Sequence, residues 1–160
     1  MKKLYFFIVS AFIIGIHSNN LNAQGLQFND LIKAYSLDSI SLKEFCTTLS
    51  YGITKIKVDN WNYTYMFQSN TDKKLQLVRT FPKDKSISVI LYYYFNKFKE
   101  YKSIKSDLMS NGYTSLNVMN VNSIQATAES YMKDQIQIEI ITSSTGPSRY
   151  TLLIHRKLEK

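Results

Sequence analysis

Few side chains in this sequence are of the kinds that perform catalysis, and those few lie far apart. Cys46 is the only cysteine, and His155 is the only histidine after position 17. A cysteine nucleophile needs an adjacent base, so these two could act only as a Cys46–His155 pair, which no local motif supports. Cys46 falls in LKEFCTTL, a segment of helical periodicity. We therefore predict that it packs as a small core residue.

Glu129 and Glu139 are the strongest carboxylate candidates, because they fall on two strands that we expect to form a hairpin. Two carboxylates held about 5 to 10 Å apart are the catalytic equipment of glycosidases. We predict a three-residue loop, 132–134, because a two-residue loop would set Glu129 opposite Ile138 on a packed face. Both glutamates would then be neighbours on the solvent face. Alternating polar residues are equally typical of an inactive, half-solvated strand, so a carboxylate-dependent hydrolase is the remotest alternative.

Signatures for metals, cofactors and nucleic acids are not found. One cysteine and one histidine cannot supply the three or four nitrogen and sulfur ligands of a zinc site. The sequence contains no calcium-loop motif, no glycine-rich phosphate loop and no serine nucleophile elbow. The formal net charge is +8, but most basic residues are lysine, whereas phosphate recognition favours arginine. We predict no catalytic residue, no metal, no cofactor and no nucleic-acid partner.

Aromatic residues are the unusual feature of the composition, with 12 tyrosines, 9 phenylalanines and one tryptophan. Alternation along 86–95 places Tyr93 toward a core and Tyr92 and Tyr94 on the opposite face. Tyrosine is enriched at binding hot spots, because it buries a large area at low entropic cost. We therefore predict Tyr92, Tyr94 and the nearby Lys97 as binding residues. The alternative is a central strand that is covered on both faces.

Residues 1–23 have the pattern of a removable signal peptide. Lys2 and Lys3 precede an apolar stretch, 4–16, which is the usual length of a signal-peptide core. A membrane span needs roughly 18 to 20 apolar residues. We predict cleavage after Ala23, which gives a periplasmic or secreted protein without stable membrane insertion. An uncleaved anchor or a core helix is the alternative interpretation.

Hydrophobic periodicity divides residues 24–160 into helices and strands of one α+β domain. A capping box at Ser41–Glu44 predicts the start of the second helix, and Gly52 its end. We expect helices at 25–35, 41–52 and 96–111, and strands at 61–67, 74–81, 86–95, 115–121, 124–132, 135–142 and 149–155.

A helix followed by about three strands thus occurs twice, at a spacing near 60 residues, in halves of roughly 24–95 and 96–160. We predict an antiparallel sheet of about six strands with two or three helices packed on one face. A tandem helix-plus-three-strand duplication is one origin of this pattern, and a single merged sheet is another. The arrangement resembles that of small exported inhibitor proteins built from tandem helix-plus-sheet units, in architecture and without a shared motif.

These features favour an exported, non-enzymatic binding module of the bacterial cell envelope, inhibitor- or immunity-like. Its basic charge favours an acidic protein partner. The alternative is binding of a small ligand, lipid or glycan in a cavity between helices and sheet, which would require an enclosed apolar space.

The leader provides the first test. The exported protein, analysed by intact mass, should begin at Gln24, because a signal peptidase cuts after a small residue. A product that still carries Met1 and is embedded in lipid would contradict the prediction.

Overall fold

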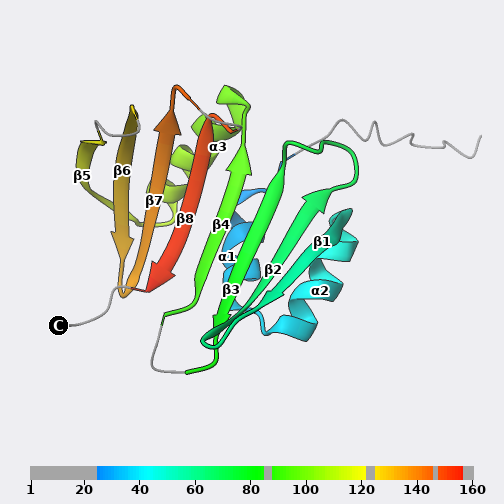
Figure 1. Cartoon of the computed structure of the whole chain (residues 1–160). Helices are drawn as coiled ribbons and strands as arrows, with labels where there is room; N and C mark the ends of the chain where they lie inside the picture. Colours follow the sequence, from blue (N-terminus) through cyan, green and yellow to red (C-terminus); the bar gives the residue numbers. More distant parts are fainter. Residues whose placement is uncertain (1–24, 85–87, 122–124, 146–147, 157–160) are drawn as a thin grey trace, which may run out of the picture.

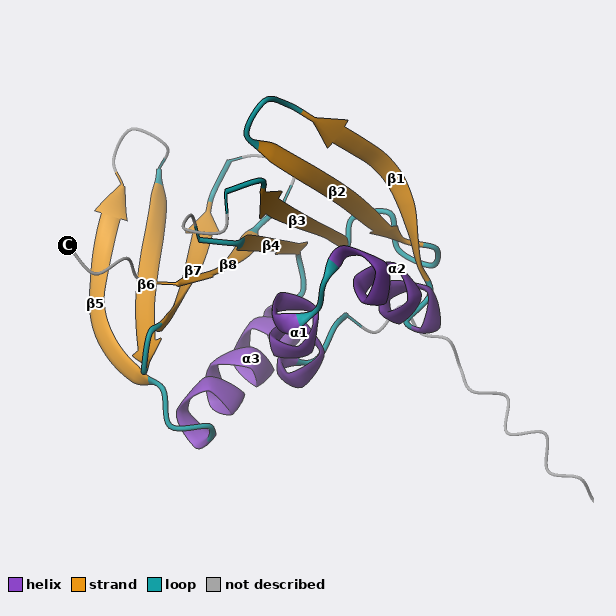
Figure 2. Cartoon of the chain, turned by 90° about the horizontal axis from the view of Figure 1, so that it is seen from below, coloured by secondary structure: helices purple, strands orange, loops and turns teal. Residues whose placement is uncertain are grey.

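The computed structural model describes residues 25–84, 88–121, 125–145 and 148–156. Within these ranges the chain forms one antiparallel sheet of eight strands, with three helices on one side of it (Figures 1 and 2). The helices are α1 (Phe28–Ser36), α2 (Ser39–Thr48) and α3 (Phe98–Ser110). The strands are β1 (Tyr51–Val58), β2 (Asn62–Ser69), β3 (Gln76–Pro82), β4 (Ile90–Phe95), β5 (Thr114–Val121), β6 (Ala126–Lys133), β7 (Ile136–Ser143) and β8 (Tyr150–Arg156). None of the described helices is long and apolar enough to cross a membrane.

The order of the strands is symmetric about the centre of the sheet. It runs β1-β2-β3-β4-β8-β7-β6-β5, so each half of the chain builds four neighbouring strands and the halves join where β4 pairs with β8. In that pair Leu91 lies opposite Ile154, and Tyr93 lies opposite Leu152. If Leu91 of the first half is taken as equivalent to Leu152 of the second, and Tyr93 as equivalent to Ile154, the two pairs are equivalent to each other.

The helices that precede the two edge strands end in the same way. Ser50 after α2 and Gly112 after α3 both have left-handed φ angles, of 60° and 81°. A buried tyrosine follows each of them, Tyr51 and Tyr113. The edge strands β1 and β5 each carry a β-bulge a few residues later. The two halves therefore resemble each other in these local details as well as in strand order.

The start and end of α2 differ from the prediction. The carboxylate of Asp38 accepts hydrogen bonds from the backbone N–H groups of Ile40 and Ser41, at 2.8 and 2.9 Å, and so caps the helix. The predicted Ser41 capping box is wrong, because Ser41 lies inside the first turn and donates its hydroxyl to Asp38. Gly52 does not end the helix and instead lies in β1.

The predicted count of about six strands is also wrong. The sequence prediction missed β1, whose sequence YGITKIKV lacks a clear alternation of apolar and polar residues. Side chains 53–58 are exposed on both faces of this edge strand, so burial imposes no period of two on them. The prediction at 115–121 does correspond to the other edge strand, β5.

The helices cover less of the sheet than the sequence predicts. They do lie on one side of it, with α1 between α2 and α3 (Figure 2). They cover only its middle, because residues 53–58 of β1 and 114–120 of β5 remain exposed. The core is therefore concentrated under α1, against the central strands β4 and β8.

Large apolar side chains fill this space. Leu31 of α1 and Leu108 of α3 are fully buried, as are Leu91 and Leu152 from the central pair. A row of stacked rings continues the core toward α3, with centroid distances of 4.9 to 5.3 Å; it consists of Tyr93, Phe95, Tyr150 and Tyr101.

Replacement of Ile154, which is fully buried in β8, tests the position of the core. Ile154→Ala should lower the free energy of unfolding by about 2 to 5 kcal/mol, because it leaves a cavity at the junction of the halves. The matched control is Ile56→Ala in the edge strand β1, where the side chain is 50 % exposed. This variant should change the free energy of unfolding by about 0.5 kcal/mol or less. Urea denaturation measures both values, and equal losses would contradict this assignment.

Candidate functional site

The face of the sheet opposite the helices is not covered by any described element, and Figure 1 looks directly onto it. We call it the open face. The alternation predicted for β4 is confirmed: Tyr93 and Phe95 are buried on the helix side, whereas Tyr92 and Tyr94 are half-buried on the open face. An exposed face of an antiparallel sheet usually carries polar side chains. The two tyrosines depart from that rule.

Tyr92 and Tyr94 form the centre of an apolar surface. Their rings stack with centroids 6.3 Å apart and planes 12° from parallel. Burial, and then the charge of Tyr92, raises the pKa of Tyr94. Strand pairing sets further apolar residues beside them on the same face. Together they form what we call the open-face patch, which consists of Met66, Val78, Ile90, Tyr92, Tyr94 and Leu153.

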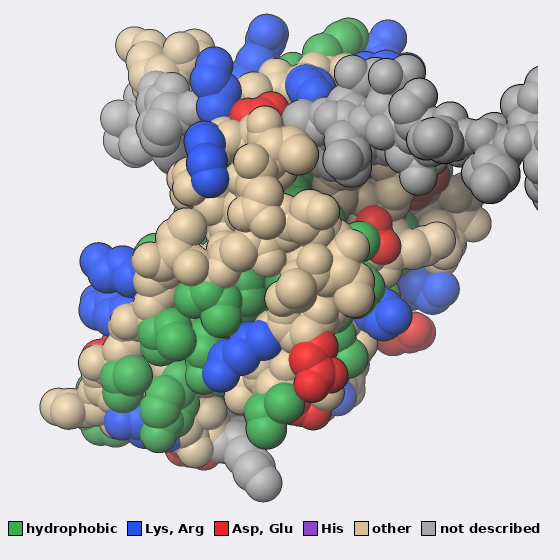
Figure 3. Space-filling model, turned by 90° about the vertical axis from the view of Figure 1, so that its right-hand side faces the viewer, with side chains coloured by type: hydrophobic (Ala, Val, Ile, Leu, Met, Phe, Trp, Pro, Cys, Tyr) green, Lys and Arg blue, Asp and Glu red, His purple; other side chains and the backbone are tan. Residues whose placement is uncertain are grey.

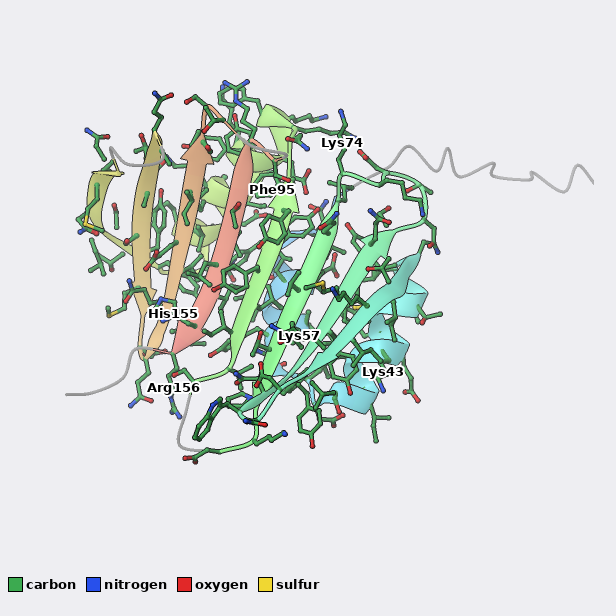
Figure 4. All side chains as sticks on the ribbon, viewed as in Figure 1. Lys43, Lys57, Lys74, Phe95, His155 and Arg156 are labelled. Carbon is green, nitrogen blue, oxygen red and sulfur yellow. The ribbon has the colours of Figure 1, made fainter. Side chains whose placement is uncertain are left out.

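A cluster of polar side chains on β7 and β8 borders the patch. Glu139 lies opposite Leu153 and accepts a hydrogen bond from the side chain of Gln137 at 3.0 Å. His155 Nε2 lies 3.5 Å from the same carboxylate oxygen, at the C-terminal end of β8 (Figure 4). The patch therefore has acceptors on one side as well as apolar area.

Lysines border the patch on the other side. Lys55 and Lys57 of β1 are exposed and lie opposite Met66 and Thr64 of β2, which places them on the open face. Lys57 is labelled in Figure 4. The third predicted residue, Lys97, lies outside the strands of the sheet. It immediately precedes α3, and its charge acts on Glu100 in the first turn of that helix.

Cys46 and His155 do not form a pair. Cys46 is 2 % exposed beneath α2, on the helix side of the sheet, whereas His155 alternates with the buried Ile154 and lies on the open face. Burial raises the pKa of the Cys46 thiol to about 12. The thiol is thus a core group, as predicted. In the described part of the chain, no three side chains of His, Cys, Asp or Glu gather where a metal ion could bind.

Glu129 and Glu139 do not form a carboxylate pair, and the predicted three-residue loop is wrong. Lys133 pairs with Ile136, which leaves a two-residue turn in which Asp134 takes a φ of 53°. Glu129 consequently lies on the helix side of the sheet. Because Glu139 lies on the open face, the two carboxylates cannot converge on one substrate.

Three hydrogen bonds make this register possible. Glu129 accepts from the hydroxyls of Tyr101 at 2.5 Å and Tyr131 at 2.8 Å, and from Lys105 Nζ at 2.6 Å. Burial acts to raise the pKa of Glu129, but these donors outweigh it and the pKa lies below its ordinary value. The predicted loop rested on the cost of burying an unpaired carboxylate, and the partners from α3 remove that cost.

A polar hollow lies near the start of α3. Its volume is about 540 Å³, and it is lined by Asn96, Gln125, Thr127, Thr142, Ser143, Ser144 and Arg149. The side-chain oxygen of Asn96 accepts a hydrogen bond from the Arg149 backbone at 2.8 Å. Its amide nitrogen is buried without a hydrogen-bond partner. The hollow differs from the apolar cavity that the alternative function would require.

A second exposed apolar area, which the sequence prediction missed, lies on the helix side of the β1–β2 hairpin. Ile53, Ile56, Val58 and Tyr63 are between 42 % and 58 % exposed. Figure 3 shows hydrophobic side chains gathered on this edge of the molecule, with basic side chains among them. Lys43 Nζ lies 4.8 Å from the ring centre of Tyr65 in the same area.

Comparison with known proteins does not add to this description: no family model, no curated protein and no solved structure matches the chain.

Replacement of Glu129 tests the polar cluster. Glu129→Gln should lower the free energy of unfolding at neutral pH by about 1 to 3 kcal/mol, because bonds to a charged acceptor are lost. The folded-state pKa is below the unfolded value, so this contribution disappears as the pH falls through the folded-state pKa. Urea denaturation at neutral and acid pH should show the difference from wild type shrinking in acid.

The exposed Glu44 of α2 supplies the control, and Glu44→Gln should have little effect at either pH. A Glu129→Gln defect of the same size at both pH values would contradict the assigned role of the carboxylate.

Proposed function

We propose that this protein is an exported, non-enzymatic module of the bacterial cell envelope that binds another protein through the open face of its sheet. The open-face patch carries the proposal. Apolar and aromatic side chains occupy the exposed side of the central strands β3, β4 and β8, where solvation alone would favour polar residues.

The patch has the properties of a protein-binding surface. It stands on strands whose opposite side is the core, so its geometry is fixed before a partner arrives and little ordering entropy is lost on binding. Tyr92 and Tyr94 present amphipathic rings, with hydroxyls that can donate to partner carbonyls or carboxylates. Glu139 and His155 beside them supply directional contacts at the rim.

The charge distribution favours an acidic partner. Lys55 and Lys57 border the patch on the same face. The whole chain has a formal net charge of +8, and removal of Lys2 and Lys3 with the predicted leader leaves about +6. Such a field speeds association with a negatively charged surface and disfavours basic competitors. An inhibitor or immunity protein that covers an acidic envelope enzyme would use a surface of this kind.

The symmetric strand order also supports a tandem duplication, now of a helix followed by four strands. Leu42 and Cys46 of α2 and Ile104 and Leu108 of α3 are buried at matching positions before the two left-handed helix ends. In such a duplication the open-face patch lies at the junction of the two units, where Tyr92 pairs with Leu153.

The polar hollow supports a second candidate, binding of a small hydroxyl-rich ligand such as a glycan. The buried amide nitrogen of Asn96 has no partner and could donate to a ligand oxygen. The hydroxyls and Arg149 that line the hollow favour such a ligand over a lipid.

A pull-down from envelope extract tests the first proposal. Wild-type protein should retain a partner that the Tyr92→Ala/Tyr94→Ala variant loses, because the variant removes both rings of the patch. Titration of that partner should show at least about a hundredfold weaker binding, as hot-spot truncations each cost about 2 kcal/mol or more.

Tyr63→Ala is the matched control, since Tyr63 is an exposed tyrosine of β2 on the other face. It should retain the partner at wild-type affinity, and circular dichroism should show that all variants are folded. Equal recovery by wild type and the double variant would remove the patch from the proposed function.

A further inference from the structure

The turn between β1 and β2 carries the only tryptophan of the chain. Trp61 is 70 % exposed, although tryptophan usually buries most of its surface in a folded protein. Its backbone is nevertheless held on both sides. The N–H group of Trp61 donates to the Asp59 carboxylate at 2.8 Å, and its carbonyl accepts from the N–H group of Lys83 at 2.8 Å. The turn therefore presents the ring to solvent from a fixed position.

Apolar side chains of both strands continue from this ring on the helix side of the hairpin. Val58 of β1 pairs with Tyr63 of β2, and Ile56 precedes Val58 on the same face. We call these four exposed residues the hairpin-tip surface; they are Ile56, Val58, Trp61 and Tyr63. Exposed apolar side chains that gather in one place, with polar residues around them, mark sites where a protein meets another protein or a membrane.

Lysines surround the hairpin-tip surface. Lys83 Nζ lies 5.1 Å from the ring centre of Tyr63 and donates a hydrogen bond to the Asp59 carbonyl at 2.6 Å. Basic side chains lie among the hydrophobic ones on this edge of the molecule (Figure 3). Across residues 51–69 and 80–84, exposed lysines outnumber acids by three to two; they are Lys55, Lys57 and Lys83 against Asp59 and Asp84.

We propose that the hairpin-tip surface docks on the surface of an anionic lipid bilayer. Tryptophan and tyrosine rings concentrate at the level of the lipid head groups, because one part of each ring is apolar and another is polar. Aliphatic side chains beside them enter the boundary of the acyl chains. Lysines attract anionic head groups, and their stems can lie along apolar surface while the ammonium group stays in water. The hairpin-tip surface combines these three kinds of side chain.

A protein partner and a second copy of the chain are the other possible occupants, and the composition favours the bilayer over both. Interfaces between proteins are enriched in arginine and depleted in lysine, whereas the exposed cations around this surface are lysines. A second copy would bring like charges together. The apolar residues also lie at or beside a turn, so a protein partner would need a hollow that matches them. Lipid adapts to their shape.

Docking of this kind is reversible and does not span the bilayer. Four side chains reach only the interfacial layer, so the docking agrees with the predicted lack of stable membrane insertion. The hairpin-tip surface shares no residue with the open-face patch. A docked protein would therefore keep that patch free for a partner beside the membrane, which adds a position to the proposed function.

The emission of Trp61 measures docking directly, because no other residue of the chain is a tryptophan. The protein is titrated with vesicles of phosphatidylglycerol and phosphatidylethanolamine, and separately with vesicles of phosphatidylcholine, which carry no net charge. Anionic vesicles should shift the emission to shorter wavelength, and brominated acyl chains should quench it. Binding to the neutral vesicles should be about tenfold weaker or more, because the attraction of the lysines is lost. High salt should reduce this difference.

Co-sedimentation with the anionic vesicles tests the individual residues. Trp61→Ala should lower the partition coefficient about tenfold, because the burial of one large apolar side chain is lost. Lys57→Gln/Lys83→Gln should lower it by a similar factor. Phe98→Ala is the matched control, since Phe98 of α3 is an exposed ring with Lys102 Nζ 4.8 Å from its centre. This variant should partition like wild type.

An unshifted Trp61 emission with anionic vesicles would overturn the inference and leave a protein as the occupant. Equal partitioning of wild type and Trp61→Ala would overturn it as well. A shift to shorter wavelength that grows with protein concentration in the absence of lipid would assign the surface to a second copy of the chain, against the inference. None of these results changes the pull-down with the Tyr92→Ala/Tyr94→Ala variant, so docking and the proposed function fail separately.

Discussion

The pairing of β4 with β8 is the interaction on which the rest of the fold depends. It is the only place where the described strands of the two halves meet in the sheet, and it brings together Leu91, Tyr93, Leu152 and Ile154, all fully buried. A sheet gains independent stability from additional strands and from packing against a helix. The pairing of β4 with β8 gives the strands of each half a buried neighbour, and α1 packs against β4 at this junction.

The sequence predicts those parts of the fold that local packing determines and misses those that depend on distant contacts. The alternation around Tyr92 and Tyr93 could be predicted, because a core on one side of a strand imposes a period of two on its apolar residues. β1 was missed because an edge strand has no such constraint. The register at Glu129 could not be predicted from the hairpin alone, since it depends on Lys105 and Tyr101 from α3. Of the proposed binding residues, the face on which Tyr92 and Tyr94 lie was predictable from alternation, whereas the position of Lys97 depends on where α3 begins.

Two buried polar groups show how the helix layer is attached. Arg79 of β3 is 2 % exposed. Its Nη2 donates to the Tyr35 carbonyl at the end of α1, and the guanidinium lies against the rings of Tyr35 and Phe81, whereas Nε and Nη1 are buried without a hydrogen-bond partner. A helix C-terminus carries partial negative charge, which favours a guanidinium there. Together with the Glu129 cluster, it links α1 to β3 and α3 to β6, on the helix side of the sheet.

The bulges in β1 and β5 have a consequence for the molecule in a crowded compartment. An eight-stranded sheet with two free edges could add strands from neighbouring copies and grow into fibrils. The extra residue between Ile53 and Lys55, and that between Ser115 and Asn117, interrupt the regular row of backbone donors and acceptors along each edge. An approaching strand can match only a short run on either side, so each edge acts as a built-in stop to polymerisation.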